Sequence, residues 1–226
     1  MVINLKNAAA RDYEDLALAP GEKPGTYDVC VADVGDNPEK RAFVTIYRFP
    51  EVGLPPRDGQ PVTVEVRAYH LSYPDGPADV EAFCVHPRTG DGYILTKGRN
   101  GRSIVYKLPA PWQPDTRTEL TKLTEVELPA AQSLARIITA ADIAPDGQRL
   151  AVRCYIDGWE WRLPLDAGDD SFDTIFKYPP VRLSLVPETQ GEALCYSADG
   201  RALLTLSEGV APVLYEHVTS SDAARP

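Results

Sequence analysis

The chain of 226 residues lacks any apolar run of the roughly 18 residues that a membrane-spanning helix requires, so we predict no membrane span. It also lacks a basic segment followed by an apolar one at its start, which leaves no visible signal peptide and leaves the compartment open. Basic residues are outnumbered, with a formal net charge of −10 and a pI of about 4.8. This balance argues against the basic surface with which proteins bind the phosphates of nucleic acids, so we expect no nucleic-acid partner.

Cysteine and histidine are scarce. The three histidines share no spacing, and no CxxC pair is present, so the sequence predicts neither a zinc site nor a disulfide. The four cysteines each lie within an apolar, strand-like segment and are expected to be buried: Cys30, Cys84, Cys154 and Cys195. Gly-x-Ser-x-Gly, P-loop, dinucleotide-binding and His-Glu-x-x-His motifs are all missing, which excludes the commonest signatures of hydrolases and nucleotide-binding enzymes.

Turn residues are plentiful. The 21 prolines and 16 glycines are spread evenly and leave only short segments between them, such as the alternating residues 42–50 and 62–71. Short alternating segments separated by turns are typical of all-β proteins, and no segment shows the pattern of a long helix. We therefore predict one all-β domain over residues 1–218, followed by a disordered tail over residues 219–226.

One pattern occurs four times. Residues 11–20, 79–87, 138–145 and 190–198 each begin with polar or acidic residues and continue as a short apolar strand. Aligning their ends brings four residues into register at intervals of roughly 50 to 70 residues: Glu14, Glu81, Thr139 and Glu192. Repeats of this size built from short strands indicate a β-propeller with four visible blades. Residues 2–6 could supply the last strand of the fourth blade and so close the ring.

The repeat also predicts a site. In a propeller blade the start of the first strand and the end of the second lie on the same face, so the acidic residues should converge at the mouth of the axis, together with Lys97 and Arg153. Crowded carboxylates repel one another unless a counter-charge is present. Those two basic residues are one source of it, and a hard cation such as calcium is another. The expected calcium ligands are Glu14, Glu81, Glu192, Asp33 and Asp36. The alternative is that these are ordinary solvated acids at strand entries.

Several longer segments carry a resemblance. They are RDYEDLA (11–17), DVGDN (33–37), YRFPE (47–51), YPDGPADVEA (73–82), GYILTK (92–97) and QGEA (190–193). Together they resemble a family of mostly uncharacterised bacterial β-propeller proteins, common in actinobacteria and often exported, which is distantly similar to calcium-dependent propellers such as β-propeller phytases and lactonases. Members of that family usually carry one more N-terminal blade, so the resemblance implies either a truncated five-bladed propeller or a four-bladed ring closed through residues 2–6.

Two functions follow as hypotheses. The first is a calcium-stabilised module that binds a small molecule or a protein at the axial mouth. The second is a calcium-dependent hydrolase of a lactone or phosphoester, in which the metal polarises the scissile oxygen, Lys97 and Arg153 hold the oxyanion or phosphate, and Glu81 acts as the base. No histidine can be placed at the mouth, which favours the first hypothesis. The oligomeric state is not predicted.

Overall fold

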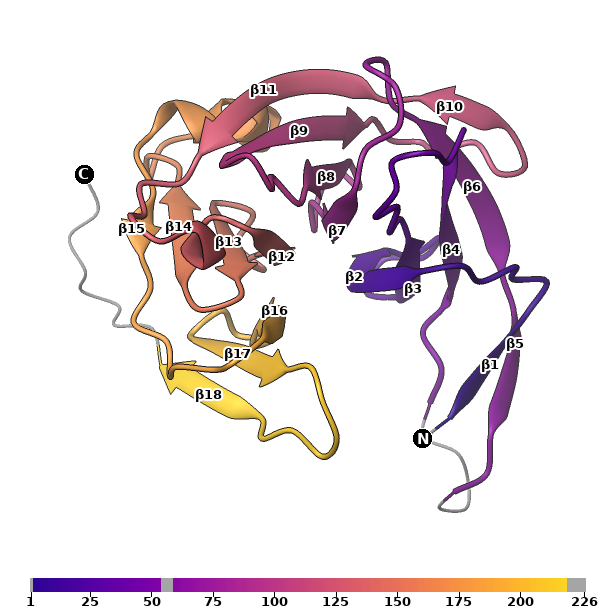
Figure 1. Cartoon of the computed structure of the whole chain (residues 1–226). Coiled ribbons are helices and arrows are strands. Elements are labelled where there is room, and N and C mark those ends of the chain that lie inside the picture. Colours follow the sequence, from indigo (N-terminus) through magenta and orange to yellow (C-terminus); the bar gives the residue numbers. More distant parts are fainter. Residues whose placement is uncertain (1, 54–58, 219–226) are drawn as a thin grey trace.

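The computed structural model describes residues 2–53 and 59–218 and is all-β. Its four main sheets are arranged around an axis as the blades of a β-propeller, which confirms the predicted fold class (Figure 1). The predicted tail at residues 219–226 lies outside the described residues. No helix among the described residues is long and apolar enough to cross a membrane.

The first two blades follow each other in the chain. Blade 1 consists of β2 (Tyr13–Pro20), β3 (Tyr27–Asp33), β4 (Val44–Pro50) and β6 (Arg67–Ser72), with β10 (Arg117–Glu119) added in parallel to β6. Blade 2 consists of β7 (Val80–Val85), β8 (Gly92–Thr96), β9 (Arg102–Leu108) and β11 (Thr121–Glu127). Because β10 belongs to the connection between β9 and β11, it ties blade 2 to the outer edge of blade 1.

The other two blades are smaller. Blade 3 consists of β12 (Ile138–Ile143), β13 (Arg149–Cys154), β14 (Gly158–Arg162) and β15 (Val181–Arg182). Blade 4 consists, within the described residues, of β16 (Gly191–Tyr196), β17 (Ala202–Ser207) and β18 (Tyr215–Val218). In each of these blades a tight turn joins the first strand to the second. Gly147 and Gly200 lie in these turns at φ of 67° and 69°, a conformation that glycine adopts without a steric penalty.

The prediction that residues 2–6 complete the fourth blade is wrong. Strand β1 (Ile3–Lys6) instead pairs in parallel with β5 (Val62–Glu65), and the two form a separate ribbon beside blade 1 (Figure 1). The physical reason is apolar packing, because Ile3 and Leu5 point from this ribbon onto buried side chains of blade 1. Among the residues that the structure describes, the ring of sheets is therefore open between blade 4 and the ribbon.

Three apolar clusters hold neighbouring blades together. One joins blades 1 and 2 through residues such as Ile46 and Phe83, and a second joins blades 2 and 3 through Cys84 and Trp161. The third joins blades 3 and 4 and includes Leu194. Full burial of one large apolar side chain contributes about 1.5–3 kcal/mol, so these clusters are the main source of stability.

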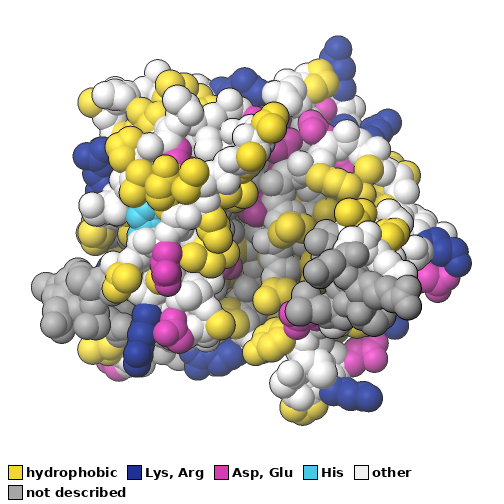
Figure 2. Space-filling model, turned by 90° about the horizontal axis from the view of Figure 1, so that it is seen from below, with side chains coloured by type: hydrophobic (Ala, Val, Ile, Leu, Met, Phe, Trp, Pro, Cys, Tyr) yellow, Lys and Arg dark blue, Asp and Glu magenta, His cyan; other side chains and the backbone are white. Residues whose placement is uncertain are grey.

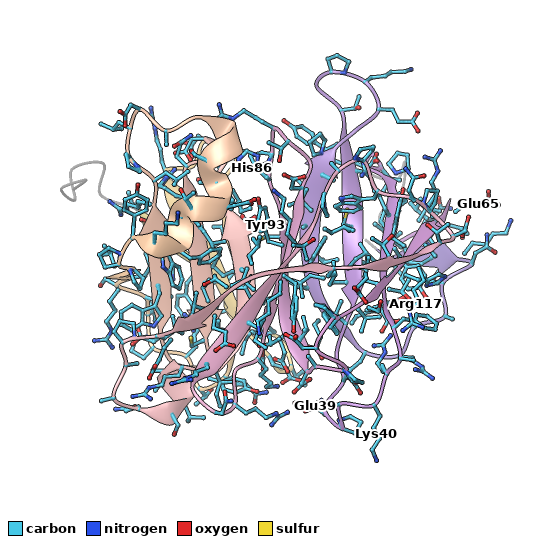
Figure 3. All side chains as sticks on the ribbon, turned by 90° about the horizontal axis from the view of Figure 1, so that it is seen from above. Glu39, Lys40, Glu65, His86, Tyr93 and Arg117 are labelled. Carbon is cyan, nitrogen blue, oxygen red and sulfur yellow. The ribbon has the colours of Figure 1, made fainter. Side chains whose placement is uncertain are left out.

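Two helical segments lie outside the sheets, η1 (Ser133–Ala135) and η2 (Asp169–Lys177). Segment η2 buries Phe172 against Tyr93 and His86 of blade 2, with ring centroids 5.1 Å and 5.0 Å apart (Figure 3). The hydroxyl of Tyr93 also donates a hydrogen bond of 2.7 Å to Asp173. This segment thus covers the seam between blades 2 and 3.

All four cysteines are free. Cys30, Cys84 and Cys154 are buried, as expected from their apolar surroundings in the sequence. Cys195 is exposed instead, because it lies on the face of β16 that turns away from blade 3 towards the opening in the ring.

Candidate functional site

The four residues aligned by the repeat occupy equivalent places in the structure. The inner strands of the blades are β2, β7, β12 and β16, and each has a register shift against its neighbour within the first three residues. In every blade the residue skipped by the ladder is the aligned one: Glu14, Glu81, Thr139 and Glu192. A β-bulge redirects the side chain of its extra residue, so the repeat in the sequence is a repeated bulge at the mouth of the axis.

Glu81 and Lys97 form the centre of this mouth. Lys97 follows β8, the second strand of blade 2, and its ammonium group donates a hydrogen bond to the Glu81 carboxylate. The two side chains are only 8% and 5% exposed, for Lys97 and Glu81 respectively. The Lys97 ammonium also lies 5.7 Å from the centre of the Tyr155 ring. The predicted convergence of Glu81 and Lys97 is therefore present, as a buried ion pair.

Glu14 and Glu192 lie near this pair, and neither forms an ion pair among the described residues. Burial, followed by the negative charges of Glu81 and Asp12, raises the pKa of Glu14 to about 8. Burial raises the pKa of Glu192 to about 6, with a further contribution from Glu81. The positive charge of Lys97 acts on both carboxyls. The Lys97 ammonium thus pairs with Glu81 and acts electrostatically on Glu14 and Glu192.

Glu14 reaches its position because of a glycine. Gly35 follows β3, and a Cβ atom at this position would collide with the carboxylates of Glu14 and Asp12. Its backbone N–H donates to the carbonyl oxygen of Asp12 at 3.3 Å. Within the aspartate-rich segment 33–37, the backbone at Gly35 therefore packs directly against the side chain of Glu14. Sequence reasoning had considered only the aspartates of this segment.

Asp33 and Asp36 are buried in a separate network. Asp33 pairs with Arg41 at 2.9 Å and accepts the backbone N–H of Asp12 at 2.9 Å. Asp36 accepts the backbone N–H of Arg41 at 2.7 Å. These contacts fold the loop after β3 around the Arg41 guanidinium, so the two aspartates do not join the glutamates of the mouth.

Asp79 has its own counter-charge. It pairs with Arg99 at 2.7 Å and accepts the backbone N–H of Asp36 at 3.2 Å. Asp79 therefore differs from Glu14 and Glu192, which have no basic partner of their own among the described residues.

Arg153 lies on the same side of the propeller but below the surface. Its side chain is 1% exposed and donates a hydrogen bond of 2.9 Å to Glu188, which itself accepts one from Thr205 at 2.9 Å. A Cβ atom at Gly191 would collide with its guanidinium. The structure thus places Arg153 under the start of β16, where it neutralises Glu188, a residue that the sequence pattern did not single out.

Two aspartates that sequence reasoning did not assign to this place hold the inner strands together. Asp15 accepts hydrogen bonds from the backbone N–H groups of Phe83 at 3.0 Å and Ala141 at 3.3 Å. Asp142 accepts one from Tyr196 at 2.8 Å. Burial raises the pKa of Asp15 well above its usual value and that of Asp142 to about 7. These groups link four blades near the axis and are not available to a ligand at the mouth.

Calcium was expected at the mouth. The carboxylate oxygens present are the donors that calcium prefers. Within residues 2–53 and 59–218, however, no group of three or more His, Cys, Asp or Glu side chains is arranged to hold a metal ion. An ammonium group already contacts Glu81. The donors fit calcium in kind but not in arrangement, and the calcium site stays a prediction.

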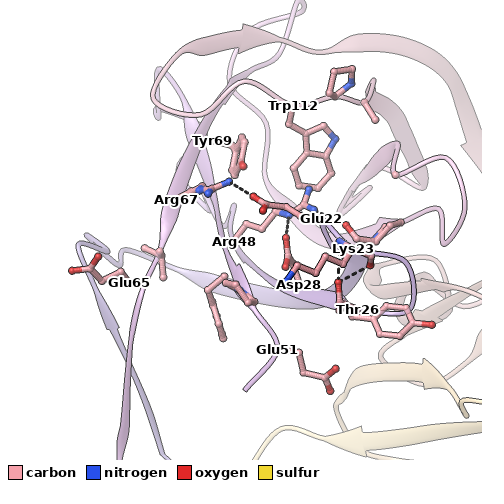
Figure 4. Close-up of a pocket in the computed structure, with 18 of the residues that line it drawn as sticks. Glu22, Lys23, Thr26, Asp28, Arg48, Glu51, Glu65, Arg67, Tyr69 and Trp112 are labelled. Carbon is pink, nitrogen blue, oxygen red and sulfur yellow. Dashed lines mark hydrogen bonds and ion pairs between the residues drawn. The ribbon is translucent and has the colours of Figure 1, made fainter. Parts of the chain in front are cut away.

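A cavity of about 1010 Å³ lies away from the mouth, where the turn between β2 and β3 approaches the loop around Trp112 (Figure 4). Its walls are bound to one another. Arg48 lies 5.2 Å from the centre of the Trp112 ring and pairs with Asp28 at 2.7 Å, while Arg67 pairs with Glu22 at 3.1 Å. None of the residues predicted for the functional site lines this cavity.

Comparisons with protein-family profiles and with curated proteins each gave no match. Among solved structures, the chain is similar to the periplasmic gluconolactonase PpgL of Pseudomonas aeruginosa, with 13% identity and a TM-score of 0.48 over 93% of this chain and 58% of that protein. It is also similar to Sqt1 of Chaetomium thermophilum, in one structure with 16% identity and a TM-score of 0.43 over 95% of this chain and 46% of the other. The chain therefore spans less than two thirds of each of these proteins.

Proposed function

We propose that the protein is a binding module whose acidic axial mouth takes up a cationic group of a small molecule or of a protein. The observation that carries this proposal is the ratio of charges around Lys97. The Lys97 ammonium acts electrostatically on three carboxyls, those of Glu14, Glu81 and Glu192, but forms an ion pair with Glu81 alone among the described residues. A cation that enters the mouth would compensate the remaining two.

Protons take the place of that cation in the free protein. With a pKa of about 8, Glu14 is mostly protonated at pH 7, because its charge is buried near other carboxylates. A bound cation stabilises the ionised form and therefore releases protons. Binding should tighten as the pH rises from 6 to about 8, and protons should be released on binding at pH 7.

The cation has two possible sources. Calcium is the inorganic one, supported by the oxygen donors, although the arrangement described above has Lys97 in contact with Glu81. An organic ammonium or guanidinium group is the other, since a carboxylate pairs with it through charge-assisted hydrogen bonds. Calcium and an organic cation are both positively charged and therefore both complement Glu14 and Glu192. An experiment is needed to distinguish them.

Isothermal titration calorimetry of the intact protein tests the proposal, with calcium chloride in one arm and agmatine, which carries both organic cations, in the other. Titration in two buffers of different ionisation enthalpy measures the proton release. Glu14→Gln should weaken binding at least tenfold. Glu127→Gln, at an exposed position of β11, is the matched control and should leave it unchanged. No binding in either arm, or equal binding by both variants, would refute the proposal.

A second candidate is a hydrolase of a lactone or phosphoester at the same mouth. It is supported by the different pKa values of Glu14 and Glu192, about 8 and about 6, because carboxyls whose pKa values are separated can act as general acid and general base. Lys97 would stabilise the developing negative charge. Arg153, which the sequence suggested for this role, is buried against Glu188. Turnover of an activated lactone or phosphoester that is lost in Glu14→Gln would favour this candidate, with EGTA added to measure its dependence on calcium.

A further inference from the structure

The face of blade 1 that turns away from blade 2 is apolar across its width but is only partly covered. The register pairs Leu16 with Val31 and Val31 with Tyr47, so these residues form one row on one face. Along that row the exposed fraction falls from 65% for Leu16 to 7% for Val31 and 4% for Tyr47. In the next row Leu18 is 51% exposed, whereas Phe49 is 3% exposed. The inner strand β2 is therefore bare where the outer strands are buried.

The cover over the outer strands is the β1–β5 ribbon. Ile3, Leu5 and Val64 of the ribbon pack against the cluster formed by Val31, Tyr47 and Phe49. The alternate residues of both ribbon strands are exposed, so the ribbon behaves as a thin sheet laid on blade 1. The apolar rows that the ribbon covers extend inwards to Leu16 and Leu18 of β2, which it does not cover.

The ribbon also has an unpaired edge. Within the described residues, β1 pairs with β5 alone. The carbonyl oxygens of Val2 and Lys6 accept hydrogen bonds from Val62 and Val66 of the β5 side, at 2.9 Å and 3.3 Å. Because backbone groups alternate in direction along a strand, those of Ile3 and Leu5 face the other edge. Figure 1 shows β1 on the side of the ribbon nearer to blade 4, so this edge faces the opening.

Blade 4 forms the opposite wall. Ala193 and Cys195 of β16 are exposed, and the register places them beside Leu206 and Leu204 of β17. The exposed Glu216 of β18 pairs with Leu204 in the same row. Figure 2 looks into this side of the molecule and shows a recess with hydrophobic side chains on both walls. Exposed apolar surface on two facing walls is typical of an interaction site.

We propose that this recess binds an extended strand of another polypeptide, which pairs with the free edge of β1 and covers Leu16 and Leu18. Addition of a strand to a sheet edge takes its affinity from backbone hydrogen bonds and its specificity from the side chains of alternate residues. A strand between two apolar walls is buried on both faces, so the partner strand is rich in β-branched apolar residues. The exposed, negatively charged side chain of Glu216 favours a basic residue in the partner strand.

The test uses a fluorescently labelled peptide in which valine and threonine alternate between two terminal lysines. Binding to the whole protein is measured by fluorescence anisotropy. The double variant Leu16→Lys/Leu18→Lys should bind at least tenfold more weakly. Leu165→Lys is the matched control, because Leu165 is 75% exposed outside the recess, and it should bind unchanged. All these positions are exposed, so each variant should fold normally.

Hydrogen exchange identifies the mode of binding. The backbone amides of Ile3 and Leu5 should become protected when the peptide binds, and a peptide of the same composition with a central proline should not bind. Absence of binding, equal binding by the double variant, or unprotected Ile3 and Leu5 amides would each overturn the proposal. A dimer of the free protein that the double variant converts to a monomer would also overturn it, because the recess would then accommodate a second copy of the chain.

Discussion

Asp15 of β2 accepts a hydrogen bond from the backbone N–H of Ala141, 126 residues further along the chain, at 3.3 Å. The same oxygen accepts the N–H of Phe83 at 3.0 Å, so one carboxylate joins the inner strands of blades 1, 2 and 3. This contact replaces, between blades, the backbone hydrogen bonds that inner strands cannot make with one another. Although Asp15 belongs to the acidic start of β2, its carboxylate therefore joins neighbouring blades and is not part of the mouth.

The first prediction concerns this contact. In Asp15→Asn, one of the two accepting oxygens becomes an NH₂ group that faces backbone donors. We expect the free energy of unfolding to fall by about 1–3 kcal/mol, the cost of leaving buried polar groups unsatisfied. Urea denaturation followed by tryptophan fluorescence measures it. Asp166→Asn, at an exposed position, is the control; equal stability of the two variants would mean that the bridge is not important.

The second prediction concerns pH. Glu14 has a folded-state pKa of about 8, above its ordinary value of 4.5, so the folded protein binds a proton more tightly than the unfolded chain does. The resulting stabilisation is fully present below pH 4.5 and is lost as the pH rises through 8. Melting temperatures of the wild type should therefore show a loss over this range that is smaller in Glu14→Gln. Parallel curves for the two proteins would contradict the raised pKa.

The third prediction tests the ion pair of Glu81 and Lys97. Lys97→Met leaves the buried Glu81 carboxylate without its counter-charge and should destabilise the protein by about 3–5 kcal/mol. The double variant Glu81→Gln/Lys97→Met removes both charges and should recover most of that loss. A double-mutant cycle in guanidinium chloride measures the coupling. Additive effects of the two substitutions would show that the groups do not act as a pair.

The fourth prediction concerns the packing of Gly191 on Arg153. Gly191→Ala places a methyl group against a guanidinium that is held by Glu188, and we expect a loss of about 1–3 kcal/mol from overpacking. Gly53→Ala is the control, because a Cβ atom at Gly53 meets nothing within 4 Å. In the background Arg153→Met/Glu188→Gln the loss caused by Gly191→Ala should shrink. A loss that persists in that background would place the clash elsewhere.

The sequence by itself determined the propeller and its repeated inner strand. Local patterns were sufficient for this, because proline and glycine mark the turns and the alternation of side chains marks the strands. The register of Glu14, Glu81, Thr139 and Glu192 was also visible, since each begins an apolar strand at the same distance from its end. That each of these residues is the extra residue of a β-bulge is visible only in the pairing of the inner strand with the second strand of its blade.

Only the tertiary structure decided what those strands meet. The pairing of β1 with β5, the burial of Arg153 against Glu188 and the reach of Asp15 to Ala141 all join segments that are distant in the chain. Leu16 and Val31 read alike in the sequence, yet one is exposed and the other buried, because the ribbon covers only the outer strands of blade 1. Periodicity gives the face on which a side chain lies, whereas its burial and its counter-charge depend on which other segment packs on that face.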